Sequence, residues 1–212
     1  MLPGLAAGGQ SEYTRPMQEI PKTSAANGGE WLTGQVLIAM PSMGDARFVQ
    51  SVIFLCAHSA EGAMGVALNR PVKAPKFAEL MRQLKVEPQP PQREIALGAG
   101  GPVEESRGFV LHSADWRGEG SMEVDGTNVL SANLEVLRAI VSGGGPRQAR
   151  LLLGYSGWGA GQLETEIREN AWLNAPADEA LLYDTAYTTK WQRALAKLKI
   201  TPGMLSGEAG RA

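Results

Sequence analysis

Residues 51–71 read SVIFLCAHSAEGAMGVALNRP, and the local structure of this stretch decides how the rest of the chain is arranged. The apolar run at 52–55 contains β-branched and aromatic residues, which is typical of a buried strand. Residues 59–62 have the composition of a turn, and a second apolar run follows at 64–68. Two apolar runs across a short glycine-containing loop predict a β-hairpin.

The predicted hairpin holds the only cysteine of the chain and one of its two histidines. Side chains alternate across a strand, so Phe54, Cys56 and His58 are expected to share one face. A protonated histidine beside a thiol favours the thiolate and lowers a pKa that is otherwise about 8.5. One hypothesis is therefore a reactive thiol at Cys56 with His58 as its partner. The alternative, which we favour, is a small buried hydrophobic residue at Cys56 and a hydrogen-bonded histidine at a strand end.

Composition restricts the class of protein. The 212 residues are enough for one sizeable core, so we expect one folded domain. With 20 Lys and Arg against 22 Asp and Glu, the formal charge of −2 argues against a dedicated DNA-binding face. One cysteine excludes an intramolecular disulfide, and no apolar run approaches the length of a membrane span. We therefore expect a cytoplasmic protein without membrane association.

The two ends of the chain differ from its middle. Residues 1–29 are rich in Gly, Pro, Ser, Thr and Ala and show no apolar period, so we expect a disordered N-terminal tail. The folded domain is expected to span residues 30–202. Residues 203–212 are expected to form a frayed C-terminal tail.

Short strands and amphipathic helices are predicted on both sides of the hairpin. Residues 35–40 are expected to form a strand that ends at Pro41. Phe77 and Leu80 begin an apolar stripe with helical spacing. The proline-rich segment 87–93 cannot continue that helix and is expected to be a loop.

A strand, a glycine turn and another strand are predicted next, at 94–97, 98–101 and 108–112. Both histidines, His58 and His112, follow an apolar run and precede Ser-Ala, which places each at a strand end.

Two further helices are expected. Ser131 is the expected N-cap of the first, and the glycines at 143–145 stop it. A strand at 150–153 follows. The closing amphipathic helix is expected to turn Lys190 toward water and to end before Pro202.

A second informative stretch, LLGYSGWGAGQLETE, occupies residues 152–166. A strand, a glycine-rich turn and a helix start would present backbone amides to an anion. The glycines do not match the dinucleotide or P-loop pattern, and no cofactor is expected. Trp158 stands where a nucleophile elbow at Ser156 would require glycine, so a tight turn is the favoured interpretation.

Three blocks of residues carry a resemblance to a known family. The first comprises Leu32, Thr33, Gly34, Gln35, Pro41, Met43, Asp45, Phe48, Cys56, His58, Gly62, Gly65, Asn69 and Pro71. The second comprises Gly100, Gly101, Pro102, Val103 and residues 108–112. The third comprises Gly154, Tyr155, Gly157, Trp158, Gly161, Gln162, Leu163, Glu164, Glu166, Asn170, Trp172 and Leu173.

In these residues and their order, the chain resembles the AlgH/YqgE family of uncharacterised bacterial proteins from Leu32 to about Leu198. Ser42 and Ala46 depart from the family pattern within one loop. The resemblance implies a single α+β domain with a coiled, largely antiparallel sheet partly covered by amphipathic helices. Members are often labelled transcriptional regulators, but no helix-turn-helix with a basic recognition face is present here, so we expect no sequence-specific DNA binding. An indirect regulatory role would not need one.

Three classes of function remain open. The first, which we favour, is a binding or regulatory module with a pocket for a small anionic molecule or a partner's segment. The second is a thiol-based redox sensor or enzyme at Cys56 and His58. The third is a metal-assisted hydrolase that would use His58, His112 and Asp45, although no metal site is assigned from the sequence.

The residues expected to line the binding pocket come from the family-like blocks and the glycine turns. They are Asp45, Asn69, Gly100, Gly101, His112, Ser156, Gly157, Trp158, Gln162 and Glu164. The sequence shows no complete catalytic motif, so binding is favoured over catalysis.

Overall fold

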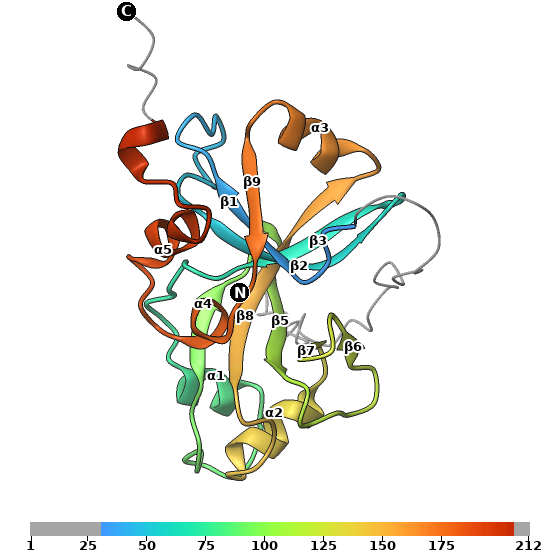
Figure 1. Cartoon of the computed structure of the whole chain (residues 1–212). Helices are drawn as coiled ribbons and strands as arrows, with labels where there is room; N and C mark the ends of the chain where they lie inside the picture. Colours follow the sequence, from blue (N-terminus) through green and yellow to red (C-terminus); the bar gives the residue numbers. More distant parts are fainter. Residues whose placement is uncertain (1–30, 206–212) are drawn as a thin grey trace, which may run out of the picture.

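The structure is a computed structural model that describes residues 31–205 (Figure 1). The predicted N-terminal tail and residues 206–212 lie outside the described residues. The strands are β1 (Gln35–Ala39), β2 (Val52–Ser59), β3 (Gly62–Ala67), β4 (Ala96–Ala99), β5 (Val103–Ser113), β6 (Met122–Glu123), β7 (Asn128–Ser131), β8 (Ala149–Gly159) and β9 (Trp172–Pro176). The helices are α1 (Phe77–Gln83), α2 (Leu134–Val141), α3 (Gln162–Arg168), α4 (Glu179–Tyr183), α5 (Lys190–Lys197) and the 3₁₀ helix η2 (Pro202–Leu205).

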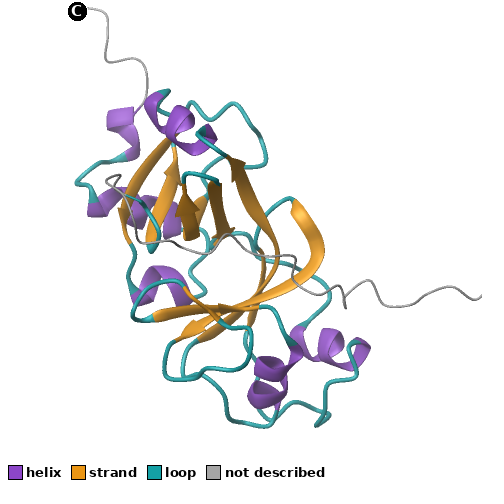
Figure 2. Cartoon of the chain, turned by 90° about the vertical axis from the view of Figure 1, so that its right-hand side faces the viewer, coloured by secondary structure: helices purple, strands orange, loops and turns teal. Residues whose placement is uncertain are grey.

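All the strands belong to one sheet, in the order β6-β7-β5-β8-β3-β2-β1-β9, and β4 adds to β8. The β4–β8 pair is parallel and the other pairs are antiparallel. In a side view the strands at the two ends of the molecule run in clearly different directions, as expected for a strongly coiled sheet (Figure 2). The predicted hairpin is confirmed as β2 and β3, and the predicted α+β class with a coiled, largely antiparallel sheet is confirmed as well.

The alternation along β1 explains why both faces of the sheet are buried. Val36 and Ile38 enter one core, which packs against α4 and α5. Leu37 and Ala39 enter a second core on the opposite face, together with the aromatic side chains of Trp158 and Trp172. The second core is the one that supports the candidate site.

A third core fills the other end of the molecule, where α1 and α2 pack on β5 and β8. The cap of α2 differs from the prediction. Asn133 is the N-cap, and its side chain accepts hydrogen bonds from the amides of Glu135 and Val136. Ser131 instead ends β7, where the ladder with β5 buries it beside His112.

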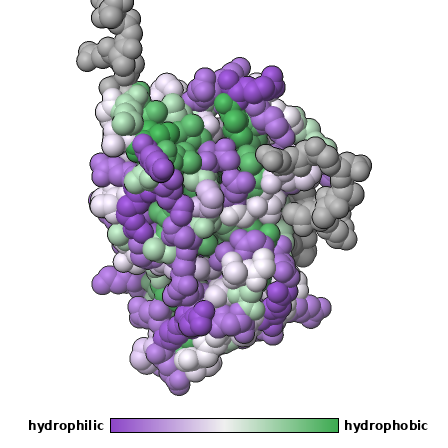
Figure 3. Space-filling model, viewed as in Figure 1, coloured by the Kyte–Doolittle hydropathy of each residue, from purple (hydrophilic) through white to green (hydrophobic). Residues whose placement is uncertain are grey.

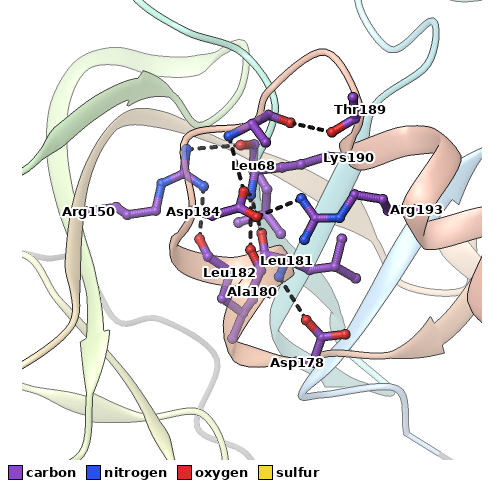
Figure 4. A network of polar contacts seen from close by, with 11 residues as sticks. Leu68, Arg150, Asp178, Ala180, Leu181, Leu182, Asp184, Thr189, Lys190 and Arg193 are labelled. Carbon is purple, nitrogen blue, oxygen red and sulfur yellow. Dashed lines mark hydrogen bonds and ion pairs between the residues drawn. The ribbon is translucent and has the colours of Figure 1, made fainter.

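Lys190 of α5 is buried rather than turned toward water, which corrects the prediction, whereas Lys197 on the same polar face is exposed. The Lys190 side chain is 0% exposed and donates to the Leu181 carbonyl at 2.7 Å and to Asp184 at 2.5 Å. Asp184 also accepts from Arg193, so one carboxylate and several carbonyl oxygens satisfy neighbouring cations (Figure 4). The helical spacing of charged residues predicted a solvated face. That spacing could not show that α4 and the residue after it supply hydrogen-bond acceptors to Lys190.

The surface is uneven in polarity. On the face seen in Figure 3, hydrophobic residues show mainly in the upper half, whereas the end that carries α1 and α2 is largely hydrophilic. Within residues 31–205, no helix is long and apolar enough to cross a membrane.

Candidate functional site

A pocket of about 330 Å³ lies between the loop after β1, the end of β8 and the segment from α3 to β9. Its walls are Met43, Asp45, Arg47, Phe48, Pro102, Val103, Gly157, Trp158, Gln162, Glu166, Ala171 and Trp172. Four residues selected from the sequence therefore meet in one place, namely Asp45, Gly157, Trp158 and Gln162.

Three aromatic rings form the floor of this pocket, which we call the aromatic pocket. Trp172 lies in the middle, with the centre of Phe48 at 5.7 Å and the centre of Trp158 at 5.9 Å. Both contacts are edge-to-face, the arrangement that aromatic quadrupoles favour. Trp158 and Trp172 are themselves 7% and 2% exposed, so the rings form a closely packed apolar base under the pocket.

Glu166 holds the two indoles in place. Its Oε2 accepts hydrogen bonds from Nε1 of Trp158 at 2.9 Å and from Nε1 of Trp172 at 2.8 Å. Its Oε1 accepts from Nε2 of Gln162, and Oε1 of Gln162 in turn accepts from the amide of Gly159. Because hydrogen bonds to an ionised carboxylate are strong, this chain fixes the floor of the pocket.

The remaining charges of the pocket neutralise each other. Arg47 donates from Nε and Nη2 to both carboxylate oxygens of Asp45, and the guanidinium lies 5.7 Å from the centre of the Phe48 ring. The Arg47 hydrogen bonds lower the pKa of Asp45, so this carboxyl is ionised at neutral pH. The pocket therefore contains a cation that is already paired.

Asn69 and Arg70 fasten the loop that forms one wall. Asn69 donates to the Gln50 carbonyl at 2.8 Å and accepts from the Val52 amide at 3.0 Å. Arg70 Nη2 donates to the carbonyls of Arg47 and Val49 and to Ser51 Oγ. Asn69, which was expected to line the site, instead acts as a positioning residue for the loop.

Gly100 and Gly101 also support the pocket from outside it. A Cβ on Gly100 would lie 2.2 Å from the Gly154 carbonyl oxygen, and a Cβ on Gly101 would lie 2.2 Å from the Tyr155 carbonyl group. Glycine is required because the two backbones touch here. The contact sets the position of Pro102 and Val103 in the pocket wall.

The predicted glycine turn at 154–161 is wrong. Strand β8 continues to Gly159, and the left-handed residue Gly161 then begins α3. Ser156 is a buried strand residue opposite Gly65, and its hydroxyl finds no hydrogen-bond partner within residues 31–205. The turn is thus confined to residues 160–161, and the glycines before it let neighbouring strands and loops approach closely.

The prediction that Cys56 and His58 share a face is wrong as well. The β2–β3 register shifts between Leu55 and Ala57, so Cys56 is the extra residue of a β-bulge. Phe54, Cys56 and Ala57 all lie in one core, because the extra residue puts Ala57 on the same face as Cys56. His58 therefore falls on the other face, where its partner Ala63 belongs to the opposite core. A one-residue insertion reverses the alternation on which the prediction rested.

His58 is a fixed part of the structure beside α3. Its Nδ1 accepts from the Leu32 amide at 3.0 Å, so the proton on Nε2 is donated to Glu164 at 3.0 Å. The Trp31 ring lies edge-on at 5.1 Å. Glu164 therefore faces His58 and does not line the aromatic pocket.

We expect iodoacetamide to modify Cys56 only when the protein unfolds. The thiol is 0% exposed, and burial, with a smaller contribution from Asp125, raises its pKa. Mass spectrometry of alkylation against urea concentration should follow the unfolding curve, and His58→Gln should not change the rate at equal stability. Rapid alkylation of the native protein with a midpoint well below about 8.5 would restore the hypothesis of a reactive thiol, whereas a midpoint near 8.5 would show an ordinary exposed thiol.

The two histidines lie far apart, which contradicts a metal site that uses both. His112 pairs with Ala149 at the start of β8, whereas the Ala63 partner of His58 pairs with Trp158 near its end. Nine residues of strand separate these positions, roughly 30 Å along β8. His112 donates from Nδ1 to the Ser113 carbonyl at 2.9 Å, and its Nε2 lies 2.8 Å from Ser131 Oγ, at an end of the molecule remote from the pocket. Within residues 31–205, no three His, Cys, Asp or Glu side chains are grouped to hold a metal.

The residues that the sequence analysis missed complete the pocket. Phe48, Glu166 and Trp172 belong to the family-like blocks but were not selected as site residues. For Glu166 and Trp172, the indicative pattern in the sequence is a glutamate that lies between two tryptophans, at positions 158, 166 and 172. Indole N–H groups that are buried need acceptors, so this spacing could have suggested the contact.

Comparisons with known proteins agree on one family. A family model described as AlgH-like matches residues 36–203. A UPF0301 protein of Rhodospirillum rubrum is 49% identical over 86% of this chain and 95% of its own length, and one of Gluconobacter oxydans is 48% identical over 85% and 98%. The solution structure of the AlgH protein from Pseudomonas aeruginosa is 40% identical with a TM-score of 0.71, and covers 89% of this chain and 100% of its own. A Corynebacterium diphtheriae protein, 23% identical, shares the fold with a TM-score of 0.63 over 86% and 95% of the two chains.

Proposed function

The chain belongs to the AlgH-like family, and from this premise we propose that it is a binding module. Its aromatic pocket takes an apolar side chain from a segment of a partner polypeptide. The observation that carries the proposal is the set of edge-to-face rings of Phe48, Trp158 and Trp172 at an open pocket. Ordered aromatic side chains in a pocket are the usual anchors of protein interfaces.

The polar groups of the pocket favour a segment over a small anion. Arg47 is the one cation among the described lining residues, and it is already paired in two-pronged fashion with Asp45. An anion at this guanidinium would lie beside the Asp45 carboxylate and be repelled by it. Glu166 already accepts three hydrogen bonds, from the two indoles and Gln162, so most of its acceptor capacity is used within the protein. An apolar side chain leaves all of these bonds intact.

A regulatory role would follow from the partner that the pocket holds. Control of another protein needs a selective contact and no catalytic group. An indirect effect on transcription, exerted through the bound partner, is therefore part of the proposal.

Two exposed valines give a matched test. Val103 lines the aromatic pocket and is 36% exposed, whereas Val49 is 45% exposed and lies outside the lining. Peptides are selected from a random display library on the wild-type protein. Their affinities are then measured for the wild type and for the Val103→Lys and Val49→Lys variants. We expect selected peptides with an apolar anchor to lose at least about tenfold in affinity on Val103→Lys, which is about 1.4 kcal/mol, and little on Val49→Lys.

The melting temperatures of both variants serve as the folding control, since exposed substitutions usually change stability by less than about 0.5 kcal/mol. A library that yields only peptides indifferent to Val103→Lys would contradict the proposed function.

A further inference from the structure

One side of β8 lacks a strand partner next to the aromatic pocket. Residues 150–153 pair with β4, and residues 149–153 pair with β5, so β4 and β5 flank opposite sides of β8. β3 pairs with residues 156–159. The Ala67 amide at the end of β3 donates to the Gly100 carbonyl just after β4, which places β3 and β4 on the same side.

The opposite side of β8 is therefore open after Tyr155. Tyr155 pairs with Val103, and β5 shows a register shift between Val103 and Gly108. Within residues 31–205, no other strand pairs with Ser156–Gly159 on this side. Gly157 is exposed and belongs to the wall of the aromatic pocket.

The backbone of Gly157 faces this open side. The Gly159 amide donates to the Gln162 side chain at 3.0 Å and not to β3. The Trp158 carbonyl oxygen faces β3, because a Cβ on Gly62 would lie 2.3 Å from it. Backbone groups alternate in direction along a strand, so the N–H and C=O of Gly157 point away from β3.

The charges around the pocket are unbalanced. Glu105 follows the lining residue Val103 by two positions in the chain, and Glu169 precedes the lining residue Ala171 by two. Both are exposed, and neither forms an ion pair with a residue of the described part. Of the nearby cations, Arg107 pairs with Glu104 at 2.7 Å, and Arg168 donates to the neutral Glu164 carbonyl and Thr165 hydroxyl, so one positive charge stands against these two carboxylates. The two glutamates therefore offer carboxylates to a partner.

Building on the proposed function, we propose that the partner segment binds as an extended strand added to the open side of β8 at Gly157. It places its apolar side chain on the aromatic rings and carries Lys or Arg beside that anchor. A strand added to a sheet edge gains backbone hydrogen bonds while its alternate side chains enter pockets. Only Gly157 offers both an N–H and a C=O here, so the contact is short and its specificity comes from the anchor and the charges.

An N-methyl scan of a selected peptide tests the strand. Fluorescein-labelled peptides that depend on Val103 are resynthesised with one backbone N-methyl group at a time, and their affinities are measured by polarisation. A methyl group on the amide that faces Gly157 should reduce affinity at least about tenfold, while methyl groups on the two neighbouring amides should have little effect. Replacing the flanking Lys or Arg with Glu should weaken binding, more at low salt than at high salt.

The protein-side variant is Gly157→Pro, which removes the N–H that faces the peptide; the peptide scan stands on its own if this variant does not fold. If N-methylation changes the affinity at no position, or changes it equally at neighbouring amides, the hypothesis of an added strand is wrong. If the peptide still depends on Val103, the proposed function survives that failure. Selected peptides with acidic flanks would overturn the charge component.

Discussion

Replacing Arg150 with alanine is expected to lower the free energy of unfolding by about 3–5 kcal/mol, because two buried carbonyls lose a cationic donor and a large buried side chain is removed. The guanidinium is 0% exposed and donates to the Leu182 carbonyl at 2.8 Å and to the Leu68 carbonyl at 2.9 Å, which joins α4 to the end of the hairpin (Figure 4). Alanine leaves both carbonyls without a donor and creates a cavity beside the Tyr187 ring.

Arg147→Ala is the matched control, because Arg147 is an exposed arginine just before the same strand. We expect it to change stability by less than about 0.5 kcal/mol. Urea unfolding followed by circular dichroism measures both variants. A loss below about 1 kcal/mol for Arg150→Ala would show that the buried cation is not needed to hold α4 on the sheet.

Replacing Gly101 with alanine should have an effect of similar size for a different reason. The added Cβ would lie 2.2 Å from the Tyr155 carbonyl carbon and oxygen and 2.5 Å from the Ser156 amide nitrogen. All three atoms are backbone, so no side chain can move aside. We expect a loss of about 3 kcal/mol or more, together with displacement of Val103 from the pocket wall and loss of peptide binding.

Gly126→Ala controls for the loss of glycine flexibility, since a Cβ there meets nothing within 4 Å. Its thermal unfolding should resemble that of the wild type. Unchanged stability and unchanged peptide binding in Gly101→Ala would mean that the backbones of 101 and 155 are not packed as described.

The sequence predicted the elements that follow from binary patterning. The hairpin at 51–71 could be predicted because two apolar runs separated by a short turn specify strand pairing locally. β9 and α4 were missed, because Trp172–Pro176 is short, contains asparagine and ends in proline. Such a strand is stabilised by its pairing with β1 and not by its own composition.

The candidate site was predicted in part for similar reasons. Asp45, Trp158 and Gln162 stand in blocks with a recognisable pattern, and the fold brings them together. The bulge at Cys56 could not be predicted, since a single extra residue in one strand depends on the partner strand. Glu166 acquires its place only because the fold brings two indole N–H groups to one carboxylate.

The most direct test of the central claim, that the aromatic pocket binds a partner's apolar side chain, is the nuclear magnetic resonance signal of the indole N–H groups. A Val103-dependent peptide is titrated into nitrogen-15-labelled protein, with Val49→Lys as the control that retains binding. We expect the Nε1–H resonances of Trp158 and Trp172 to shift together, with nuclear Overhauser contacts between the peptide anchor and the rings of Phe48 and Trp172. Saturating binding that leaves both indole resonances in place would contradict it.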